Sequence, residues 1–201
     1  MPAWTALHAD TYRLYGRSGW RLTLKGAAGS RPFRAIVTMR LCQAARDARA
    51  PWKYLLPFCK LLHRSATRRA GIDFSWQTRV GPGFALTHGW GTVISPGAII
   101  GSNVTLLHGA TLGRRDRITA PDQRSSAYPT LEDGVWVGPH AIITGAITIG
   151  QGSRIAGGTV VLADVPPASI VAGNPGKIIA SDCVPDVMNA APLAAPASQA
   201  R

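Results

Sequence analysis

Apolar residues between positions 74 and 161 of this chain recur every six positions. A period of six is neither the 3.6 of an α-helix nor the 2 of a β-strand, and hexapeptide repeats are typical of a parallel β-helix. A small residue often follows the apolar one, as in Val80-Gly81 and Val137-Gly138, and permits a tight bend between short strands. The pattern therefore predicts a mainly β fold over residues 71–180. Its apolar positions are Phe74, Val80, Leu86, Ile94, Ile100, Leu106, Leu112, Leu131, Val137, Ile143, Ile149, Ile155 and Val161.

The period is interrupted twice. Two extra residues separate Leu86 from Ile94, and this slip contains Thr87-His88-Gly89-Trp90-Gly91. A repeat that loses register around a histidine indicates a scaffold interrupted to display a reactive group. The second interruption, residues 113–130, is polar, charged and rich in turn residues. A long loop inserted into a compact repeat is usually functional or disordered.

The residues before the repeat favour helices. Apolar residues at helical spacing predict one helix over 31–50 and a second over 51–70, separated by Pro51 and ended by Gly71. Pro57 marks a position where the second helix can kink. In the weakly patterned residues 1–30, ADTYRLYG predicts a short helix and GAAGS a break. Residues 181–201 end in AAPLAAPASQAR, which has too little bulk to pack, and we expect a disordered tail.

The net positive charge is confined to residues 1–80, which include the predicted helices. Residues 1–80 contain 15 Lys and Arg against three acidic residues, whereas residues 81–201 contain seven of each. Such a region suits an anionic membrane surface, an acidic polymer or nucleic acid, or it is simply a solvated face. No nucleic-acid-binding motif accompanies the charge, so we predict no nucleic-acid partner.

Other features place the protein in the cytoplasm. No run approaches the roughly 18 apolar residues of a membrane span, and MPAWTALHADTYR lacks the apolar core of a signal peptide. We therefore expect a cytoplasmic protein whose basic residues give it the option of peripheral contact with the inner membrane surface. Cys42, Cys59 and Cys183 form no CxxC pair, and we interpret them as reduced thiols.

Asp73 and His88 are the candidate reactive pair. Residues about one turn apart in a coiled prism return beside each other, so fifteen residues plus the slip can bring a carboxylate to an imidazole. Asp73 would fix the tautomer of His88, leaving its other ring nitrogen to accept a proton from a hydroxyl. The glycines of His88-Gly89-Trp90-Gly91 indicate close backbone approach.

These residues carry a resemblance to a known family. The order GID…THG…VTLLHGATLG…YPTLEDGVWVGPHAIITG…ITIG…DVPPASIVAGNPGK resembles the serine acetyltransferase family of left-handed β-helix acyltransferases, over about residues 71–180. It is most similar to the short members associated with capsule and exopolysaccharide synthesis. The resemblance implies an acetyl-CoA-dependent O-acetyltransferase without a metal, working as a homotrimer with sites between subunits.

The resemblance also assigns roles to residues. His88 matches the catalytic histidine, which deprotonates the acceptor hydroxyl, and Asp73 matches its carboxylate partner. His108 matches a position beside the cleft. In the family, small residues let the pantetheine arm of CoA lie along the prism, and their counterparts in this chain are Gly113, Gly138, Ala156 and Gly157. The candidates to bind the phosphates of CoA are Arg154 and Lys177.

Departures from the family pattern bear on the acceptor. Serine acetyltransferases have an aspartate before the catalytic histidine, where this chain has Thr87, and an Arg-His pair before the loop proline, where it has Ala127-Tyr128. Burying the charges of serine without partners is costly. A saccharide stacked on Trp90 and Tyr128 fits these neutral positions better. We therefore predict sugar O-acetylation in polysaccharide or glycoconjugate assembly.

Three alternatives remain open from the sequence. The first is serine O-acetylation, which the scaffold and the Asp73–His88 pair permit. The second is a β-helix zinc enzyme of carbonic-anhydrase type, in which His88, His108 and His140 would have to converge on the metal. The third is a non-catalytic β-helix scaffold.

Overall fold

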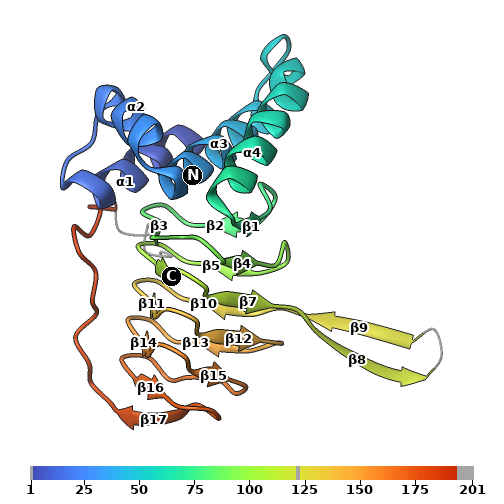
Figure 1. Cartoon of the computed structure of the whole chain (residues 1–201), viewed down its shortest axis with the longest axis vertical. Coiled ribbons are helices and arrows are strands. Elements are labelled where there is room, and N and C mark those ends of the chain that lie inside the picture. Colours follow the sequence, from blue (N-terminus) through green and yellow to red (C-terminus); the bar gives the residue numbers. More distant parts are fainter. Residues whose placement is uncertain (1, 121–122, 194–201) are drawn as a thin grey trace, which may run out of the picture.

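A β-helical prism with helices packed on its first coil forms the molecule (Figure 1). The computed structural model describes residues 2–120 and 123–193. Within these, the helices are α1 (Ala3–Tyr15), α2 (Trp20–Gly29), α3 (Arg31–Asp47), the 3-10 turn η1 (Trp52–Leu55) and α4 (Leu56–Ala70). The predicted mainly β fold with a small N-terminal helical region is confirmed.

The helix ends follow local chemistry. The Ser30 hydroxyl accepts a hydrogen bond from the Phe33 amide and caps α3. Gly71 ends α4 in the left-handed conformation (φ 65°) that favours glycine. Pro57 lies in the first turn of α4, where it needs no amide partner, so it begins this helix rather than kinking it.

The predicted break at 26–30 lies largely inside a helix. Gly26 and the next three residues complete α2, and only Ser30 leaves the helical conformation. A Cβ on Gly26 would lie 2.8 Å from the Phe33 ring, so this glycine allows α2 to approach α3 closely. Packing between helices therefore decides the conformation of a segment whose local sequence favours a turn.

Three parallel sheets form the prism. Sheet A contains β1 (Asp73–Phe74), β4 (Val93–Ile94), β7 (Thr111–Gly113), β12 (Ile142–Thr144) and β15 (Val160–Val161). Sheet B contains β2 (Arg79–Val80), β5 (Ile99–Ile100), β10 (Thr130–Leu131) and β13 (Thr148–Ile149). Sheet C contains β3 (Ala85–Thr87), β6 (Thr105–Leu107), β11 (Trp136–Val137), β14 (Arg154–Ile155), β16 (Ile170–Ala172) and the antiparallel β17 (Lys177–Ala180).

The core is a stack of the predicted apolar residues. Leu106, Val137 and Ile155 are register partners on three successive coils of sheet C, and all three are buried. Each contributes roughly 1.5–3 kcal/mol relative to exposure, because its side chain leaves water completely. The apolar residues that recur every six positions therefore form one continuous core inside the prism.

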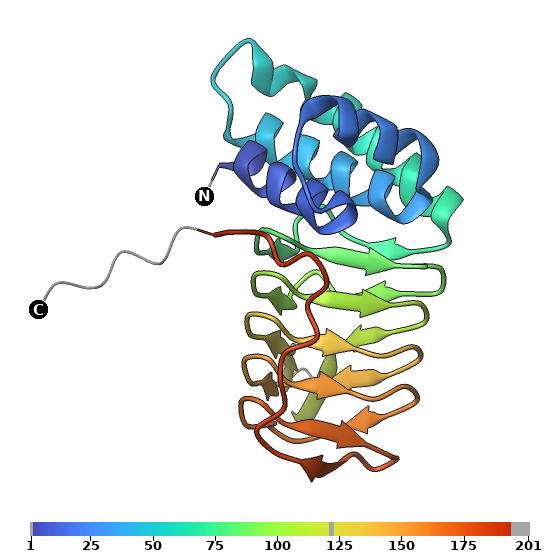
Figure 2. The ribbon, with the colours of Figure 1, turned by 90° about the vertical axis from the view of Figure 1, so that its left-hand side faces the viewer.

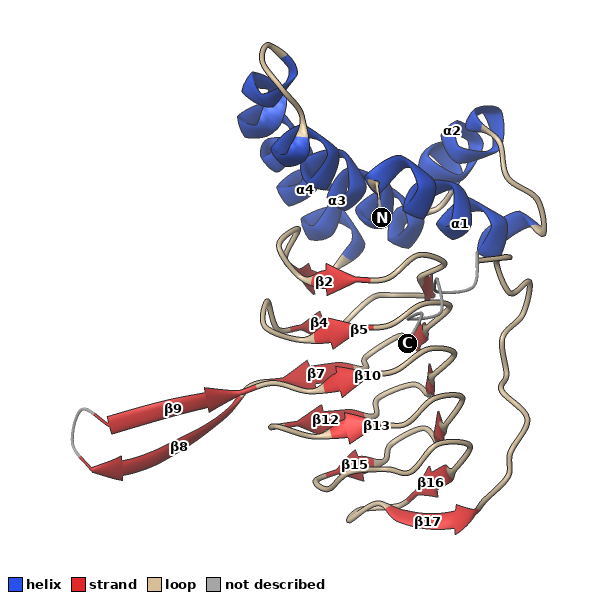
Figure 3. Ribbon diagram, turned by 180° about the vertical axis from the view of Figure 1, so that it is seen from behind, coloured by secondary structure: helices blue, strands red, loops and turns tan. Residues whose placement is uncertain are grey.

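The inserted segment 113–130 forms a projecting hairpin. Its strands β8 (Arg115–Ala120) and β9 (Gln123–Ala127) pair antiparallel and extend away from the prism (Figure 3). Asp116 pairs with both Arg114 and Arg124 and bridges the hairpin base to its second strand. The sequence predicted an insertion here but not a hairpin.

Residues 181–193 form an extended strap rather than the predicted disordered tail. The strap runs along the prism from its last coil back to the helices (Figure 2). Asn189 donates a side-chain hydrogen bond to the Arg13 carbonyl, and Ala191 and Asn103 exchange two hydrogen bonds. The rest of the predicted tail, residues 194–201, lies outside the described residues.

A buried ion pair joins the helices to the first coil. Arg40 of α3 donates to the Asp10 carboxylate of α1 at 2.8 Å, and both side chains are almost completely buried. Arg40 also donates to the Val80 and Gly81 carbonyls, while Asp10 accepts from the Phe84 amide. Burial raises the pKa of Asp10, and the nearby Arg40 guanidinium opposes that rise.

Arg13 makes a second buried link. Its guanidinium donates to the Gly83 carbonyl, the Thr105 hydroxyl and the Met188 carbonyl of the strap. Burial lowers the pKa of Arg13 to about 10. Arg13 therefore links helix α1 to two coils of the prism and to the strap.

Among the described residues, no helix is long and apolar enough to cross a membrane.

Candidate active site

The slip in the repeat forms a bulged corner between sheets C and A. His88 occupies the left-handed region (φ 58°), which is uncommon for a residue with a side chain. A Cβ on Gly89 would lie 2.9 Å from the Leu86 side chain and 3.0 Å from Pro32, so only glycine fits below the bulge. The two extra residues thus push His88 and Trp90 out to exposed positions.

Equivalent corners of the next two coils bring further rings beside this bulge. The ring of His108 stacks on Trp90, with centroids 5.0 Å apart and planes 21° apart. The ring of His140 lies edge-on to His108 at 5.1 Å, and His88 lies edge-on to His108 at 6.3 Å. We call residues 88–91, 108–109, 139–140 and 157–158 the histidine corner.

Backbone hydrogen bonds keep the histidine corner in register. The Gly109 amide donates to the Trp90 carbonyl, and the His140 amide donates to the His108 carbonyl. Among the described residues, the buried Nδ1 atom of His108 has no hydrogen-bond partner. Because an unpaired buried polar atom is costly, this ring nitrogen is suited to form a hydrogen bond with a group from outside the protomer.

Gly109 makes room for the ring of His140. A Cβ on Gly109, whose φ is 68°, would lie 2.3 Å from the His140 Nδ1 atom. Gly158 occupies the equivalent position two coils beyond Gly109, with a similar φ of 69° and nothing within 4 Å of its position for a Cβ. The two glycines therefore share a backbone conformation and differ in their surroundings.

Gly109→Ala should destabilise the fold more than the matched change Gly158→Ala. Both changes carry the left-handed backbone penalty of roughly 1–2 kcal/mol, but only Gly109→Ala also displaces the His140 ring, at about 1–3 kcal/mol for overpacking. Urea unfolding at fixed protein concentration measures the difference. Equal destabilisation would show that His140 does not lie over Gly109.

The three histidines do not form a metal centre. Although the rings of His88, His108 and His140 lie close together, no group of three or more His, Cys, Asp or Glu side chains among the described residues is placed to hold a metal ion. The zinc-enzyme alternative lacks its ligand set in this part of the chain.

Asp73 lies near the bulge without contacting His88. The Gly91 amide donates to the Gly71 carbonyl, which places the bulge beside the start of β1, where Asp73 is exposed. Within the protomer, neither a hydrogen bond nor an ion pair joins Asp73 to His88, although the structure describes both residues. The predicted contact between them stays a prediction.

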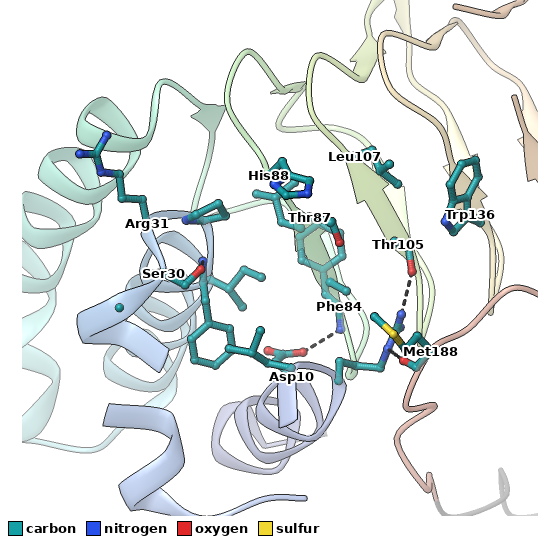
Figure 4. A pocket seen from close by; sticks show the side chains of 18 of the residues that line it. Asp10, Ser30, Arg31, Phe84, Thr87, His88, Thr105, Leu107, Trp136 and Met188 are labelled. Carbon is teal, nitrogen blue, oxygen red and sulfur yellow. Dashed lines mark hydrogen bonds between the residues drawn. The ribbon is translucent and has the colours of Figure 1, made fainter. Parts of the chain in front are cut away.

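A pocket of about 790 Å³ opens beside the bulge, between the helices and sheet C (Figure 4). Thr87 and His88 lie at its β-helix side, and Asp10 of α1 lies on the opposite side. Arg31, at the start of α3, is an exposed cation in the same lining. The sequence analysis missed Arg31 because nothing in its local pattern links it to a corner more than fifty residues away.

The predicted donor-binding residues are divided between two corners. Gly138, Ala156 and Gly157 lie together below the rings of the histidine corner, whereas Gly113 lies at the end of β7, where the hairpin leaves the prism. A Cβ on Gly138 would lie 2.6 Å from the Gly157 amide nitrogen, so close stacking of the coils already requires glycine there.

The two predicted phosphate ligands are also separate. Arg154 pairs with Asp186 of the strap and lies over the Trp136 ring, 5.1 Å from its centroid. Lys177 begins β17 on the last coil and is exposed. Of the two, Lys177 is exposed and Arg154 is half-buried.

Tyr128 lies at a different corner from Trp90. Its ring covers Gly97, where a Cβ would lie 2.6 Å from two ring atoms, and Gly97 belongs to the corner between sheets A and B. Thr87, in contrast, precedes the bulge at the histidine corner. One protomer therefore does not bring Trp90, Thr87 and Tyr128 around a single acceptor.

Comparisons with known proteins agree with this geometry. Residues 128–163 match the family model described as bacterial transferase hexapeptide (six repeats). The chain is 34% identical over 151 residues to a serine acetyltransferase of Bacillus subtilis, covering 73% of this chain and 67% of that protein. A serine O-acetyltransferase structure from Brucella melitensis superposes with a TM-score of 0.69 at 32% identity, covering 90% of this chain and 68% of that one.

A plant relative is longer. Serine acetyltransferase 4 of Arabidopsis thaliana is 41% identical over 138 residues, and the match spans 68% of this chain but 38% of the plant protein. The fold and the histidine corner define a transferase built on hexapeptide repeats. The chain belongs to the family of left-handed β-helix acyltransferases whose members above are named serine acetyltransferases.

The predicted saccharide acceptor and polysaccharide pathway are wrong. The relatives and the solved structure described above are named serine acetyltransferases. The prediction rested on the neutral residues Thr87 and Ala127-Tyr128, and the named relatives overturn it. Within one protomer these residues lie at different corners, so a single protomer does not join them in one acceptor site.

Proposed function

We propose that this protein is an acetyl-CoA-dependent serine O-acetyltransferase. The observation that carries the proposal is the histidine corner, where an interrupted coil displays His88 beside a substrate-sized pocket in a chain of this family. No other described feature combines an exposed imidazole, a strained backbone and a pocket.

In the proposed reaction His88 accepts the proton of the serine hydroxyl while that oxygen attacks the thioester carbonyl of acetyl-CoA. Asp73 orients the imidazole, and backbone N–H groups stabilise the tetrahedral oxyanion. Collapse of the intermediate breaks the carbon–sulfur bond, and the departing CoA thiolate takes the proton from His88. The products are O-acetylserine and CoA.

We propose that the active form is a homotrimer with sites between neighbouring protomers. Tyr128, Gly113 and the β8–β9 hairpin lie at a different corner from His88 within one protomer. Apposition of that corner to the histidine corner of a neighbour would gather these groups around one substrate. The separation of the predicted residues supports this arrangement.

The proposed donor path runs below the rings of the histidine corner. The pantetheine arm would lie against Gly138, Ala156 and Gly157, and the exposed Lys177 would meet CoA phosphates. Arg154 is a weaker candidate because Asp186 already pairs with it. Trp90 and His108 would line the acceptor side with Thr87.

CoA release with L-serine, compared with L-alanine, tests the proposed acceptor. L-Alanine has the same charged groups and lacks the hydroxyl, so the proposal predicts turnover with serine and only background release with alanine. Thiol detection with purified protein and acetyl-CoA measures both. Equal release with and without serine would contradict the proposed function.

A further inference from the structure

Helix α4 exposes its large apolar side chains and buries its small ones. The buried residues of α4 are Cys59, His63, Ala66, Thr67 and Ala70. On the outward side Phe58 is 60% exposed and Leu61 is 64% exposed. A helix that only packs on a core does the reverse, because burial of large apolar groups stabilises it most.

The exposed apolar side chains form one continuous stripe. Residues three, four and seven positions apart share an α-helix face. Leu55, the residue that caps α4, and Phe58 and Leu62 within α4 follow that spacing. The α4 stripe comprises Trp52, Tyr54 and Leu55 of η1 together with Phe58, Leu61 and Leu62 of α4. Contiguous apolar surface of this kind marks an interaction site, whereas single exposed apolar residues do not.

The α4 stripe lies in purely cationic surroundings. Residues 48–72 contain no acidic residue, and their basic residues are Arg49, Lys53, Lys60, Arg64, Arg68 and Arg69. The preceding acid, Asp47, already pairs with Arg46. Arg64 and Arg68 are exposed one turn apart along the edge of the stripe.

The stripe also lies at an outer end of the molecule. Figures 1 and 3 show the α3–α4 hairpin projecting away from the prism, on the side opposite to the last coil. Helix α2 lies at the same end and exposes Trp20 (66%) and Leu24 (59%) beside Arg21 and Lys25. Aromatic and basic residues are therefore repeated across this end.

The charge decides between the possible partners. A symmetric contact between two copies would place the same cationic surface against itself, which is unfavourable. Aromatic and aliphatic side chains between lysines and arginines suit the headgroup region of an anionic bilayer, where the apolar groups enter the interface and the cations meet lipid phosphates. We propose that the α4 stripe docks this protein peripherally on an anionic lipid surface.

Vesicle sedimentation tests the proposal. Wild-type protein should pellet with phosphatidylcholine vesicles containing phosphatidylglycerol and not with phosphatidylcholine alone, and high salt should weaken the binding. Each basic residue near an anionic surface changes the partition roughly fivefold. Arg64→Glu with Arg68→Glu should therefore lower it by more than about 10-fold, and Phe58→Ser with Leu61→Ser should also abolish most binding.

The exposed pair Ile178 and Ile179 on the last coil provides the matched control. Ile178→Ser with Ile179→Ser should leave vesicle binding unchanged. Absence of wild-type binding, or equal binding by the stripe variants, would overturn the proposal.

Sedimentation velocity without lipid tests whether the stripe instead joins copies of the chain. A species heavier than three 21.2 kDa chains that dissociates in the Phe58→Ser, Leu61→Ser variant would assign the stripe to self-association and contradict lipid docking. Neither vesicle binding nor sedimentation velocity depends on acetyl transfer.

Discussion

Replacing His88 with alanine is expected to lower kcat for serine-dependent CoA release by about 10²–10⁴-fold, the usual contribution of a general base. KM for serine should change much less, because the imidazole acts mainly as the hydroxyl proton leaves. His88 is exposed at a bulge, so the variant should fold normally. Steady-state kinetics, with unfolding curves for both proteins, measure the effect.

His140→Ala is the matched control for this prediction. The His140 ring belongs to the same corner but lies over Gly109 and beside His108, one coil further along the prism. We expect a smaller loss of kcat than for His88→Ala. If His140→Ala abolished turnover while His88→Ala retained it, the assignment of the base would be wrong.

Replacing Arg40 with methionine is expected to lower the free energy of unfolding by about 3–5 kcal/mol, because removal of one partner leaves the buried Asp10 carboxylate without its counter-charge. Arg40 also holds two carbonyls of the first coil. The loss should therefore loosen the helices from the prism. Thermal or urea unfolding at fixed protein concentration measures it, since assembly shifts apparent stability.

Arg46→Met on the same helix is the control. Arg46 pairs with Asp47 at the surface, where roughly half of each side chain is exposed, and such pairs contribute less than about 1 kcal/mol. Comparable destabilisation by Arg40→Met and Arg46→Met would contradict the assigned role of the buried pair.

The prism could be predicted because its information is local and repeated. Each coil buries apolar residues such as Leu106 and Val137 in the same way, so the six-residue period reports directly on the interior. The bulge was predictable for the same reason, since two extra residues around His88 are visible against a regular background. Neither inference needed long-range contacts.

The attachment of the helices was not predictable in this way. Asp10, Arg13 and Arg40 form contacts across 30 to 175 positions, and a basic residue in a helix usually indicates a solvated face. The strap escaped prediction because residues 181–193 are held by hydrogen bonds to Asn103 and Arg13 rather than by apolar burial. Amino-acid composition indicates how much apolar surface a segment can bury, but it does not reveal which residues will form hydrogen bonds with that segment.

The site was predictable residue by residue but not as an assembly. His88 lies where the slip predicted, and His108 lies beside it. Tyr128 and Gly113 lie at another corner, and sequence spacing carries no information about which corners meet between protomers. The wrong prediction of a saccharide acceptor came from inferring the substrate from the neutral residues Thr87 and Ala127-Tyr128 alone.

The most direct test of the proposed function is product identification with L-serine as the acceptor. Purified protein, acetyl-CoA and L-serine are incubated, and free CoA and acetylated serine are quantified together, with His88→Ala in parallel. Our account predicts O-acetylserine and CoA in equal amounts for the wild type and near-background levels for the variant. CoA release without acetylated serine, or equal product from His88→Ala, would contradict it.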